Sequence, residues 1–275
     1  MSKQKILDEL LKVSKMYKAN DNNIKSFVYY NAYFNLKNGI DKGIGKSITE
    51  FINNIKKGKV IYPKDIQIIP TIKGFSIKTM KEMKKKGYDT PKKIMDAYIN
   101  GKIKLTNQQI IGLKYNDKML KRIPRSKIKR LENKLKKTGK NFKILGSYSR
   151  GATSSGDIDL LIYGKTTINS MLEEFNVLET IARGSNRYMG LVKLGKDIVH
   201  LDIVKVLKGE LITAILYFSG PANFNIMMRN IAKDKGYKLS RYGLFDRKTG
   251  KKIKLKNEKD LFKKLGMEYI PVENR

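Results

Sequence analysis

The sequence contains no cysteine, a single histidine and far fewer acidic than basic residues. Without cysteine the chain can form neither disulfides nor thiolate metal sites, which leaves its redox compartment open. No apolar run approaches the roughly 20 residues of a membrane-spanning helix, so no membrane partner is expected. The first residues read as an amphipathic helix that carries acidic side chains, unlike a secretory or transit signal. An intracellular location is therefore expected.

Positive charge is the strongest feature of the composition. Lysine and arginine total 59 against 25 acidic residues, a formal net charge of +34. A surface this basic repels itself, and a polyanion is its natural partner. A general drift toward lysine, isoleucine and asparagine accounts for part of the lysine content but not for so large an excess. Nucleic acid is the expected partner, and an acidic membrane surface is the weaker alternative because no long basic amphipathic helix is evident.

The hydrophobic pattern divides the 275 residues into a helical part and a later mixed part. Residues 1–60 and 66–118 show the apolar spacing of helices, with breaks near Gly87 and Gly101. From about residue 140 the period changes to that of strands. The expected strands are 142–145, 159–163, 190–194 and 198–206, and the expected helices are 167–182 and 225–235. Helices followed by a mixed sheet predict an α+β fold.

Two glycine turns in the helical part are candidate contacts to nucleic acid. Gly43 and Gly45, followed by Lys46, lie between two expected helices and suit a helix-hairpin-helix turn. Such glycines let the backbone approach a phosphate with its N–H groups pointing at it. Gly74 marks a second possible hairpin. The alternative in both places is a glycine that simply ends a helix.

Residues 146–164 carry the clearest sign of chemistry. A Gly-Ser turn opens the segment, and Asp157 and Asp159 then lead into an apolar strand. Alternation along a strand places both carboxylates on one face. They would repel each other without cations between them, and Mg²⁺ favours such oxygen ligands together with phosphates. Backbone N–H groups of the turn can hold an anion nearby.

A third carboxylate strengthens this interpretation. An Asp-x-Asp pair alone is weak, since a chain with 25 acidic residues could carry one on a solvated face. Asp202, however, lies in the apolar segment 198–206 and could lie beside the first strand in one sheet. In-line phosphoryl transfer through two metal ions uses such carboxylates. The sequence therefore predicts a site for metal-assisted nucleotidyl transfer.

Residues 146–159 resemble the nucleotidyl-transfer signature of family X DNA polymerases, the group of DNA polymerase β. Other segments resemble family motifs in the same order: 109–115, 121–125, 216–221, 223–229, 236–245 and 257–262. The Lys-rich tail is similar to that of the small family X enzymes of large DNA viruses. If the chain is viral, its location would be the virion or the host-cell cytoplasm.

The resemblance implies four domains along the chain. A helical lyase-like DNA-binding domain is expected at 1–62 and a helix-hairpin-helix subdomain at 63–120. A nucleotidyltransferase palm with a mixed sheet is expected at 121–218. A small α+β nucleotide-selecting subdomain would follow at 219–275.

The resemblance also implies a role for each site residue. Asp157 and Asp159 would bridge two Mg²⁺ ions, with Mn²⁺ as an alternative, and Asp202 would bind only the ion that activates the primer 3′-hydroxyl. The residues implied to contact the nucleotide are Ser147, Arg150, Gly156, Tyr217, Phe218, Gly220 and Asn225. Those implied to contact DNA are Gly43, Gly45, Lys46, Gly74 and Arg229.

Each implied contact fits the chemistry of its side chain. The Arg150 guanidinium matches a phosphate, and Tyr217 and Phe218 offer a flat wall against which a 2′-hydroxyl would collide. Asn225 suits the acceptors of the minor groove. The Gly220–Pro221 bond is a candidate for the cis form. The alternative for the two aromatic residues is ordinary core packing.

Departures from the family pattern predict a lost activity. In the amino-terminal domain of the family a lysine forms a Schiff base with an abasic sugar, and Phe51 lies at that position here. Phenylalanine has no amine, so a lyase nucleophile is not expected. Lys46, Lys56 and Lys57 are candidate substitutes, each better explained as a solvated phosphate contact. His200, two residues before Asp202, is a candidate for tuning the metal site or simply a polar residue in a strand.

The predicted function is a DNA-directed DNA polymerase of family X that fills short gaps in base excision repair. Its partners would be gapped or primer-template DNA and dNTPs, and a monomer is expected. One alternative is a template-independent or RNA-directed nucleotidyltransferase with the same metal site. Another is a non-catalytic DNA-binding protein that kept the fold.

Overall fold

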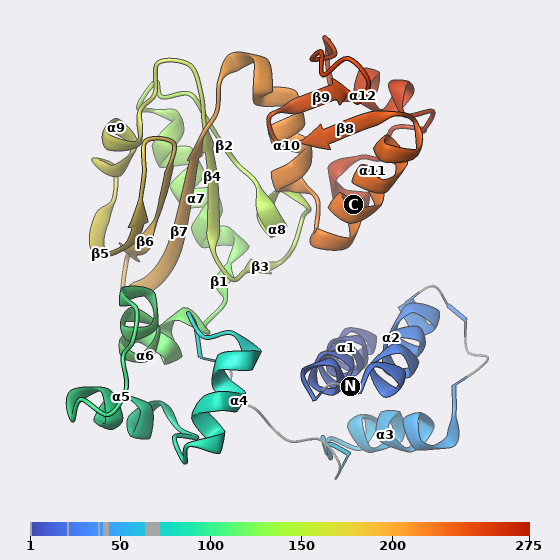
Figure 1. The fold of residues 1–275 in the computed structure, drawn as a ribbon, viewed down its shortest axis with the longest axis vertical. Helices are drawn as coiled ribbons and strands as arrows, with labels where there is room; N and C mark the ends of the chain where they lie inside the picture. Colours follow the sequence, from blue (N-terminus) through green and yellow to red (C-terminus); the bar gives the residue numbers. More distant parts are fainter. Residues whose placement is uncertain (1, 21, 38, 41–43, 64–71) are drawn as a thin grey trace. The chain divides into compact units, whose positions relative to one another are not determined.

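The structure is a computed structural model that describes residues 2–20, 22–37, 39–40, 44–63 and 72–275 (Figure 1). The chain divides into two compact units, Met1–Lys104 and Leu105–Arg275. Each unit is described by itself, and the finer division into four domains stays a prediction. Within the described ranges no helix has the length and apolarity needed to cross a membrane.

The first unit begins with three helices, α1 (Lys3–Ala19), α2 (Asn23–Lys37) and α3 (Lys46–Lys56). The Ser2 hydroxyl accepts a hydrogen bond from the Lys5 amide and so caps α1. The three helices bury one apolar cluster that includes Leu10, Val13, Tyr29, Ile48, Phe51, Ile52 and Ile55. The helical prediction for 1–60 is confirmed where the chain is described.

Two further helices, α4 (Ile77–Lys85) and α5 (Pro91–Ile99), complete this unit. Each starts at a side-chain cap: the Ser76 hydroxyl accepts from the Thr79 amide, and the Thr90 hydroxyl accepts from the Lys93 amide. Pro91 lies in the first turn of α5, where a backbone N–H would have no acceptor within the helix, so its lack of an N–H costs nothing. The predicted breaks near residues 87 and 100–101 are confirmed.

The second unit contains a five-stranded mixed sheet with the order β2-β4-β7-β6-β5. The strands are β2 (Phe142–Ile144), β4 (Ile158–Ile162), β5 (Asn176–Arg183), β6 (Arg187–Leu194) and β7 (Asp197–Lys205). Only the β4–β7 pair is parallel; the other three pairs are antiparallel. Two short strands, β1 (Ile123–Pro124) and β3 (Ser154–Ser155), pair beside it. The predicted α+β class with a mixed sheet is confirmed.

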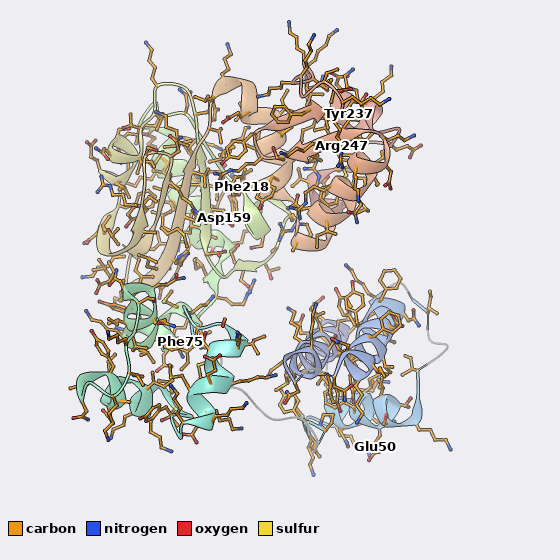
Figure 2. The ribbon with its side chains drawn as sticks, in the orientation of Figure 1. Glu50, Phe75, Asp159, Phe218, Tyr237 and Arg247 are labelled. Carbon is orange, nitrogen blue, oxygen red and sulfur yellow. The ribbon has the colours of Figure 1, made fainter. Side chains whose placement is uncertain are left out.

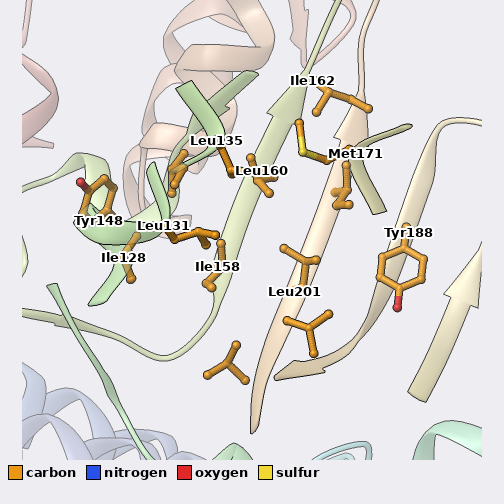
Figure 3. Close-up of a cluster of buried hydrophobic side chains, with 14 of the residues drawn as sticks. Ile128, Leu131, Leu135, Tyr148, Ile158, Leu160, Ile162, Met171, Tyr188 and Leu201 are labelled. Carbon is orange, nitrogen blue, oxygen red and sulfur yellow. The ribbon is translucent and has the colours of Figure 1, made fainter. Parts of the chain in front are cut away.

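Helices cover both faces of this sheet. One face packs on α7 (Arg125–Lys136) and α9 (Ile168–Leu172) (Figure 3). That cluster includes Ile128, Leu131, Leu135, Ile158, Leu160, Met171, Leu201 and Ile203. On the other face, α6 (Asn107–Met119) packs near Leu191, while α10 (Leu211–Ser219) packs near Leu161 and Val204.

The last part of the chain forms its own core. It comprises α11 (Ala222–Asp234), β8 (Tyr237–Ser240), β9 (Gly243–Asp246) and α12 (Glu258–Lys264). The buried cluster includes Phe224, Met228, Leu244, Leu261 and Phe262. The fully buried Arg275 side chain donates to Glu258 at 3.0 Å and to the Ser219 hydroxyl at 2.6 Å.

The predicted helix at 167–182 is wrong beyond Leu172, because residues 176–183 form β5. The register of β5 against β6 shifts twice, between Val177 and Glu179 and between Thr180 and Ala182. These β-bulges bring Leu178 and Ile181 to the same cluster on α6. Apolar residues three positions apart therefore mimic the period of a helix.

Gly190 on β6 leaves room for its neighbour Tyr188. The Tyr188 side chain is fully buried, and its hydroxyl donates to the Glu179 carbonyl at 3.4 Å. A Cβ at position 190 would lie 2.1 Å from the Tyr188 hydroxyl and 2.4 Å from the Glu179 carbonyl oxygen.

We predict that Gly190→Ala lowers the free energy of unfolding by about 1–3 kcal/mol, measured by urea titration. Gly209→Ala is the matched control, since the nearest atom to its Cβ would be the end of Lys252 at 3.9 Å. The control should stay within about 0.5 kcal/mol of the wild type. Equal stability of the two variants would contradict the proposed crowding.

Candidate metal and nucleotide site

The parallel pairing of β4 and β7 sets the geometry of the site. Asp159 on β4 is directly opposite Asp202 on β7. Ile158 and Leu160 on β4, like Leu201 on β7, belong to the core on the α7 side, so alternation turns both aspartates to the opposite face. Asp157 immediately precedes β4. The expected neighbouring position of Asp202 in the same sheet is thus what the structure has.

The short helix α8 (Gly146–Ser149) lies against Asp159 (Figure 2). Gly146 has a φ of 61°, and a Cβ there would lie 1.9 Å from Asp159 Oδ2. Both the left-handed conformation and the close approach require glycine. The Leu145 amide also donates to the Asp159 carbonyl at 2.9 Å. The Gly-Ser turn therefore positions the backbone of α8 directly beside a carboxylate.

Burial and charge repulsion together govern the electrostatics of this site. Burial is the largest cause and the neighbouring Asp157 and Asp202 add to it, so that the pKa of Asp159 rises to about 7 against the opposing effect of Arg150 and Arg187. A divalent cation would relieve this repulsion. Three carboxylates close together on one face of the sheet are the hard oxygen donors that Mg²⁺ and Mn²⁺ accept, so the residues present fit such ions.

Arg187 is a site residue that the sequence did not reveal. It lies on β6 and binds Asp202 through two hydrogen bonds, Nη2 to Oδ2 at 2.7 Å and Nε to Oδ1 at 3.3 Å. This contact raises the pKa of Arg187. Across the described part of the chain, no three Asp, Glu or His side chains are already arranged to hold a metal ion. The Arg187 contact thus engages both carboxylate oxygens of Asp202.

The predicted phosphate contacts lie on and after α8. The Ser147 hydroxyl donates to Ser155 at 2.9 Å, and Arg150 Nη1 donates to the Ser219 carbonyl at 2.8 Å. Burial lowers the pKa of Arg150, whereas the nearby Asp159 and Asp157 raise it. A Cβ at Gly156 would meet no atom within 4 Å, so its backbone faces open space.

Tyr148 connects α8 to α7. Its hydroxyl donates to Glu132 at 2.8 Å, its carbonyl accepts from Arg125 at 2.6 Å, and the Arg125 guanidinium lies 4.3 Å from its ring centroid. Burial and the Glu132 carboxylate raise the pKa of Tyr148 to about 12. Burial opposes ionisation of Glu132, yet hydrogen bonds from Tyr148, Lys129 and Lys136 lower its pKa to about 2. These contacts fix the orientation of α8.

The predicted sugar and base contacts lie around the end of α10. The rings of Tyr217 and Phe218 meet edge to face with centroids 5.1 Å apart, and Phe218 lines a small hollow with Asp159 and Asp202 (Figure 2). Asn225 Nδ2 donates to the carbonyls of Tyr217 at 2.8 Å and of Gly220 at 3.1 Å.

The turn between α10 and α11 differs from expectation in one respect. No cis peptide bond occurs among the described residues, so the suggestion of a cis Gly220–Pro221 bond is wrong. A Cβ at Gly220 would lie 2.4 Å from the Phe224 ring. Close packing of that ring, rather than bond isomerism, accounts for the glycine.

Two further residues were predicted to have different roles, Arg229 as a contact to DNA and His200 as a residue that tunes the metal site. Arg229 is exposed on α11, and its Nε donates to the Asn225 carbonyl at 3.1 Å. His200 lies two residues before Asp202 on β7 and is partly buried on the same face. Their roles stay predictions.

The predicted glycine turns of the first unit are described in part. Gly43 lies outside the described residues, whereas Gly45 caps α3 and Lys46 is its exposed first residue. Gly74 has a φ of 86°, a conformation that favours glycine. Two residues further on, the Ser76 side chain caps α4.

Phe51 lies in the core of the first unit. It is 4% exposed, packs with Ile48 and Ile55, and its ring meets Tyr29 edge to face at 6.0 Å. The same residue lines a hollow of about 440 Å³ whose only described cation is Lys25. Lys25 was not among the candidate substitutes, since its distance along the sequence from α3 gives no sign of its proximity.

Comparison with protein families defines the class of this protein. Residues 122–207 match the family described as DNA polymerase beta palm, and residues 214–275 match DNA polymerase beta thumb. The palm match contains the sheet with Asp157, Asp159 and Asp202, and the thumb match contains α11. These are the two parts of a family X nucleotidyltransferase.

Curated relatives agree with this class. The chain is 32% identical to DNA polymerase lambda of Rattus norvegicus over 205 residues, which are 62% of this chain and 36% of the rat protein. It is 31% identical to Repair DNA polymerase X of African swine fever virus over 142 residues, which are 49% of this chain and 81% of the viral protein. The match thus spans about a third of the rat relative and most of the viral one.

The chain belongs to family X, the DNA polymerase β family. The resemblance stated from the motifs, including the similarity to polymerases of large DNA viruses, is confirmed. The individual roles of the site residues stay predictions.

The Glu132–Tyr148 contact predicts a pH dependence. The folded pKa of Glu132, about 2, lies below its ordinary value of 4.5. Its contribution to stability is therefore complete above pH 4.5 and is lost as the pH falls toward 2. The difference in unfolding free energy between the wild type and Glu132→Gln should shrink over that range, measured by urea titration. Glu173→Gln, at an exposed carboxylate, is the control, and its unfolding free energy should change with pH as that of the wild type does. If the difference in unfolding free energy between Glu132→Gln and the wild type stayed constant over that range, the assignment would be contradicted.

Proposed function

We propose that this protein is a DNA-directed DNA polymerase that adds dNTPs to a primer 3′-hydroxyl in gapped DNA, as in base excision repair. The observation that carries the proposal is the register of Asp159 beside Asp202, with Asp157 one residue before β4. The phosphate-binding helix α8 lies against the same carboxylate. A basic chain in a polymerase family supplies the affinity for the nucleic acid.

Asp157, Asp159 and Asp202 would hold two divalent cations. When bound, such ions lower the pKa of the primer 3′-hydroxyl and stabilise the charge on the transferred phosphoryl group. The chain's part is to bring the three carboxylates together and to release Asp202 from Arg187. Ser147, Arg150 and the Gly156 amide would bind the outer phosphates of the nucleotide and so orient it.

Residues around α10 and α11 would select the nucleotide. Tyr217 and Phe218 would exclude a 2′-hydroxyl, and Asn225 already fixes the backbone beneath them through its bonds to Tyr217 and Gly220. Reaching a base in the minor groove would require the Asn225 amide to give up these carbonyls. Arg229, one turn further along α11, would contact the template strand. These two residues favour templated synthesis over template-independent addition.

The metal assignment predicts the effect of Asp202→Ala. Nucleotide addition should fall about a thousand-fold or more, because the ligand that activates the 3′-hydroxyl is lost. Affinity for gapped DNA should stay nearly unchanged, since the basic surface is intact. Primer extension with each dNTP, together with a DNA-binding titration, measures both quantities.

Asp197→Ala is the matched control, since Asp197 lies on the same strand and pairs with Lys127 instead. It should extend primers at close to the wild-type rate. Near wild-type extension by Asp202→Ala would refute the two-metal assignment. Extension of a single strand without a template, or on an RNA template only, would favour the alternative nucleotidyltransferase.

We further propose that the lyase activity of the amino-terminal domain is lost. Phe51 offers no amine and fills the core between Tyr29, Ile48 and Ile55. Incubation with an incised abasic site and borohydride should trap no covalent complex above background. Phe51→Lys should restore trapping if the alignment is correct.

A strong adduct with the wild type would mean that another lysine has taken over the chemistry. Lys25 would be the first to replace, because it lines the hollow beside Phe51, and Lys46 and Lys56 would follow. Phe51→Leu is the control, since it keeps an apolar side chain and adds no amine.

A further inference from the structure

A basic groove lies on the surface of the thumb, between α11 and β8. Its volume is about 360 Å³. Four cations line it, Arg229, Lys233, Lys238 and Arg247, and no acidic side chain does. All four are exposed. Figure 2 labels Tyr237 and Arg247 on this subdomain. We call these lining residues the thumb groove.

No acidic side chain that the structure describes neutralises the cations of the thumb groove, although Arg229 donates through Nε to the Asn225 carbonyl. Considering only residues that the structure describes, none of the four forms an ion pair with an acidic side chain. The neighbouring Asp246 accepts hydrogen bonds from the amides of Lys248 and Thr249 in its own turn. The positive charge of the groove is therefore left for a ligand.

Two of the groove cations, Arg229 and Lys233, lie on α11 and continue a row that starts at Asn225, outside the lining of the groove. Asn225, Arg229 and Lys233 follow each other at intervals of four residues, so they form one row on the helix with steps of about 6 Å. This step is comparable with the distance between neighbouring phosphates of an extended strand. The row begins at Asn225, the residue expected to reach the nascent base pair.

The far wall of the groove is held by backbone hydrogen bonds. The Arg247 amide donates to the Gly236 carbonyl at 2.9 Å, which brings Arg247 back to the turn between α11 and β8. Lys238 on β8 pairs with Phe245 on β9. These two cations thus face the helical row from a rigid hairpin.

The groove also offers an aromatic surface. Tyr237 is partly buried against the thumb core and lines the groove together with Ile226. Cations that follow a backbone, combined with an aromatic ring on which a base can stack, are typical of sites for single-stranded nucleic acid. A duplex keeps its bases stacked on each other and could not use Tyr237 in this way.

We propose that the thumb groove binds the unpaired template strand beyond the nascent base pair, with its phosphates on Lys233, Lys238 and Arg247 and a base on Tyr237. This inference rests on the proposed function for the identity of the strand. Arg229 would contact the template strand between the polymerase site and the groove. The ligand chemistry is that of a single-stranded phosphodiester.

The experiment uses the full chain and two labelled DNAs. One is a primer-template with a long single-stranded template overhang, and the other is the same duplex with blunt ends. The triple variant Lys233→Ala, Lys238→Ala and Arg247→Ala is compared with a control triple variant of equal charge change, Lys256→Ala, Lys263→Ala and Lys264→Ala, at exposed lysines within or next to α12. Circular dichroism and thermal melting confirm that both variants fold.

The groove variant should lose about tenfold or more in affinity for the overhang DNA, and its log–log salt slope should fall by about 2, since each lost phosphate contact on a single strand contributes about 0.7. Its affinity for blunt duplex should change no more than that of the control variant. Tyr237→Leu should weaken binding of the overhang without changing the salt slope. Lys233→Arg with Lys238→Arg should keep it.

The proposal would be overturned by an equal loss for both triple variants, or by an equal loss on both DNAs. A failure of the Asp202→Ala test would leave this binding result intact, so the two proposals are judged separately.

Discussion

Repulsion between carboxylates held on one face of a sheet is the constraint around which the palm is organised. The parallel pairing of β4 and β7 fixes Asp159 beside Asp202, and no side-chain rearrangement can separate the strands. The compensating features are all local: a glycine that lets α8 lie against Asp159, the guanidinium of Arg150, and the two hydrogen bonds from Arg187 to Asp202. A site that is costly without cations is one that binds them readily.

Much of this site was predictable because its signals are local. The three aspartates follow or interrupt apolar strands, and a strand's alternation decides which face a residue takes. Arg187 was not predictable, since it reaches Asp202 through the antiparallel pairing of β6 with β7 and stands fifteen residues away. Glu132 likewise supports α8 only because α7 packs under the sheet. β5 was mistaken for a helix because its bulges bring Leu178 and Ile181, three residues apart in the sequence, to the same cluster.

Charge was the least informative signal at the level of single residues, although it was the most informative overall. Among 59 basic residues, nothing in the sequence distinguishes Lys233 or Arg247 from lysines on any solvated face. The distinction is made by the fold, through the return of the β8–β9 hairpin onto α11 and the absence of acidic side chains from the groove's lining. The proposed loss of the lyase amine is the reverse case, because Phe51 differs in chemistry from the expected lysine and its burial then follows from the helical pattern.

Ser219 is where the palm and the thumb are joined by more than the chain itself. Arg150 of the palm donates to its carbonyl, while Arg275 of the thumb donates to its hydroxyl. One residue thus accepts hydrogen bonds from an arginine of each part. Rotation of the thumb about the Gly220-Pro221 turn would strain these hydrogen bonds. Movement of the thumb against the sheet would therefore require at least one of these two arginines to give up its hydrogen bond to Ser219.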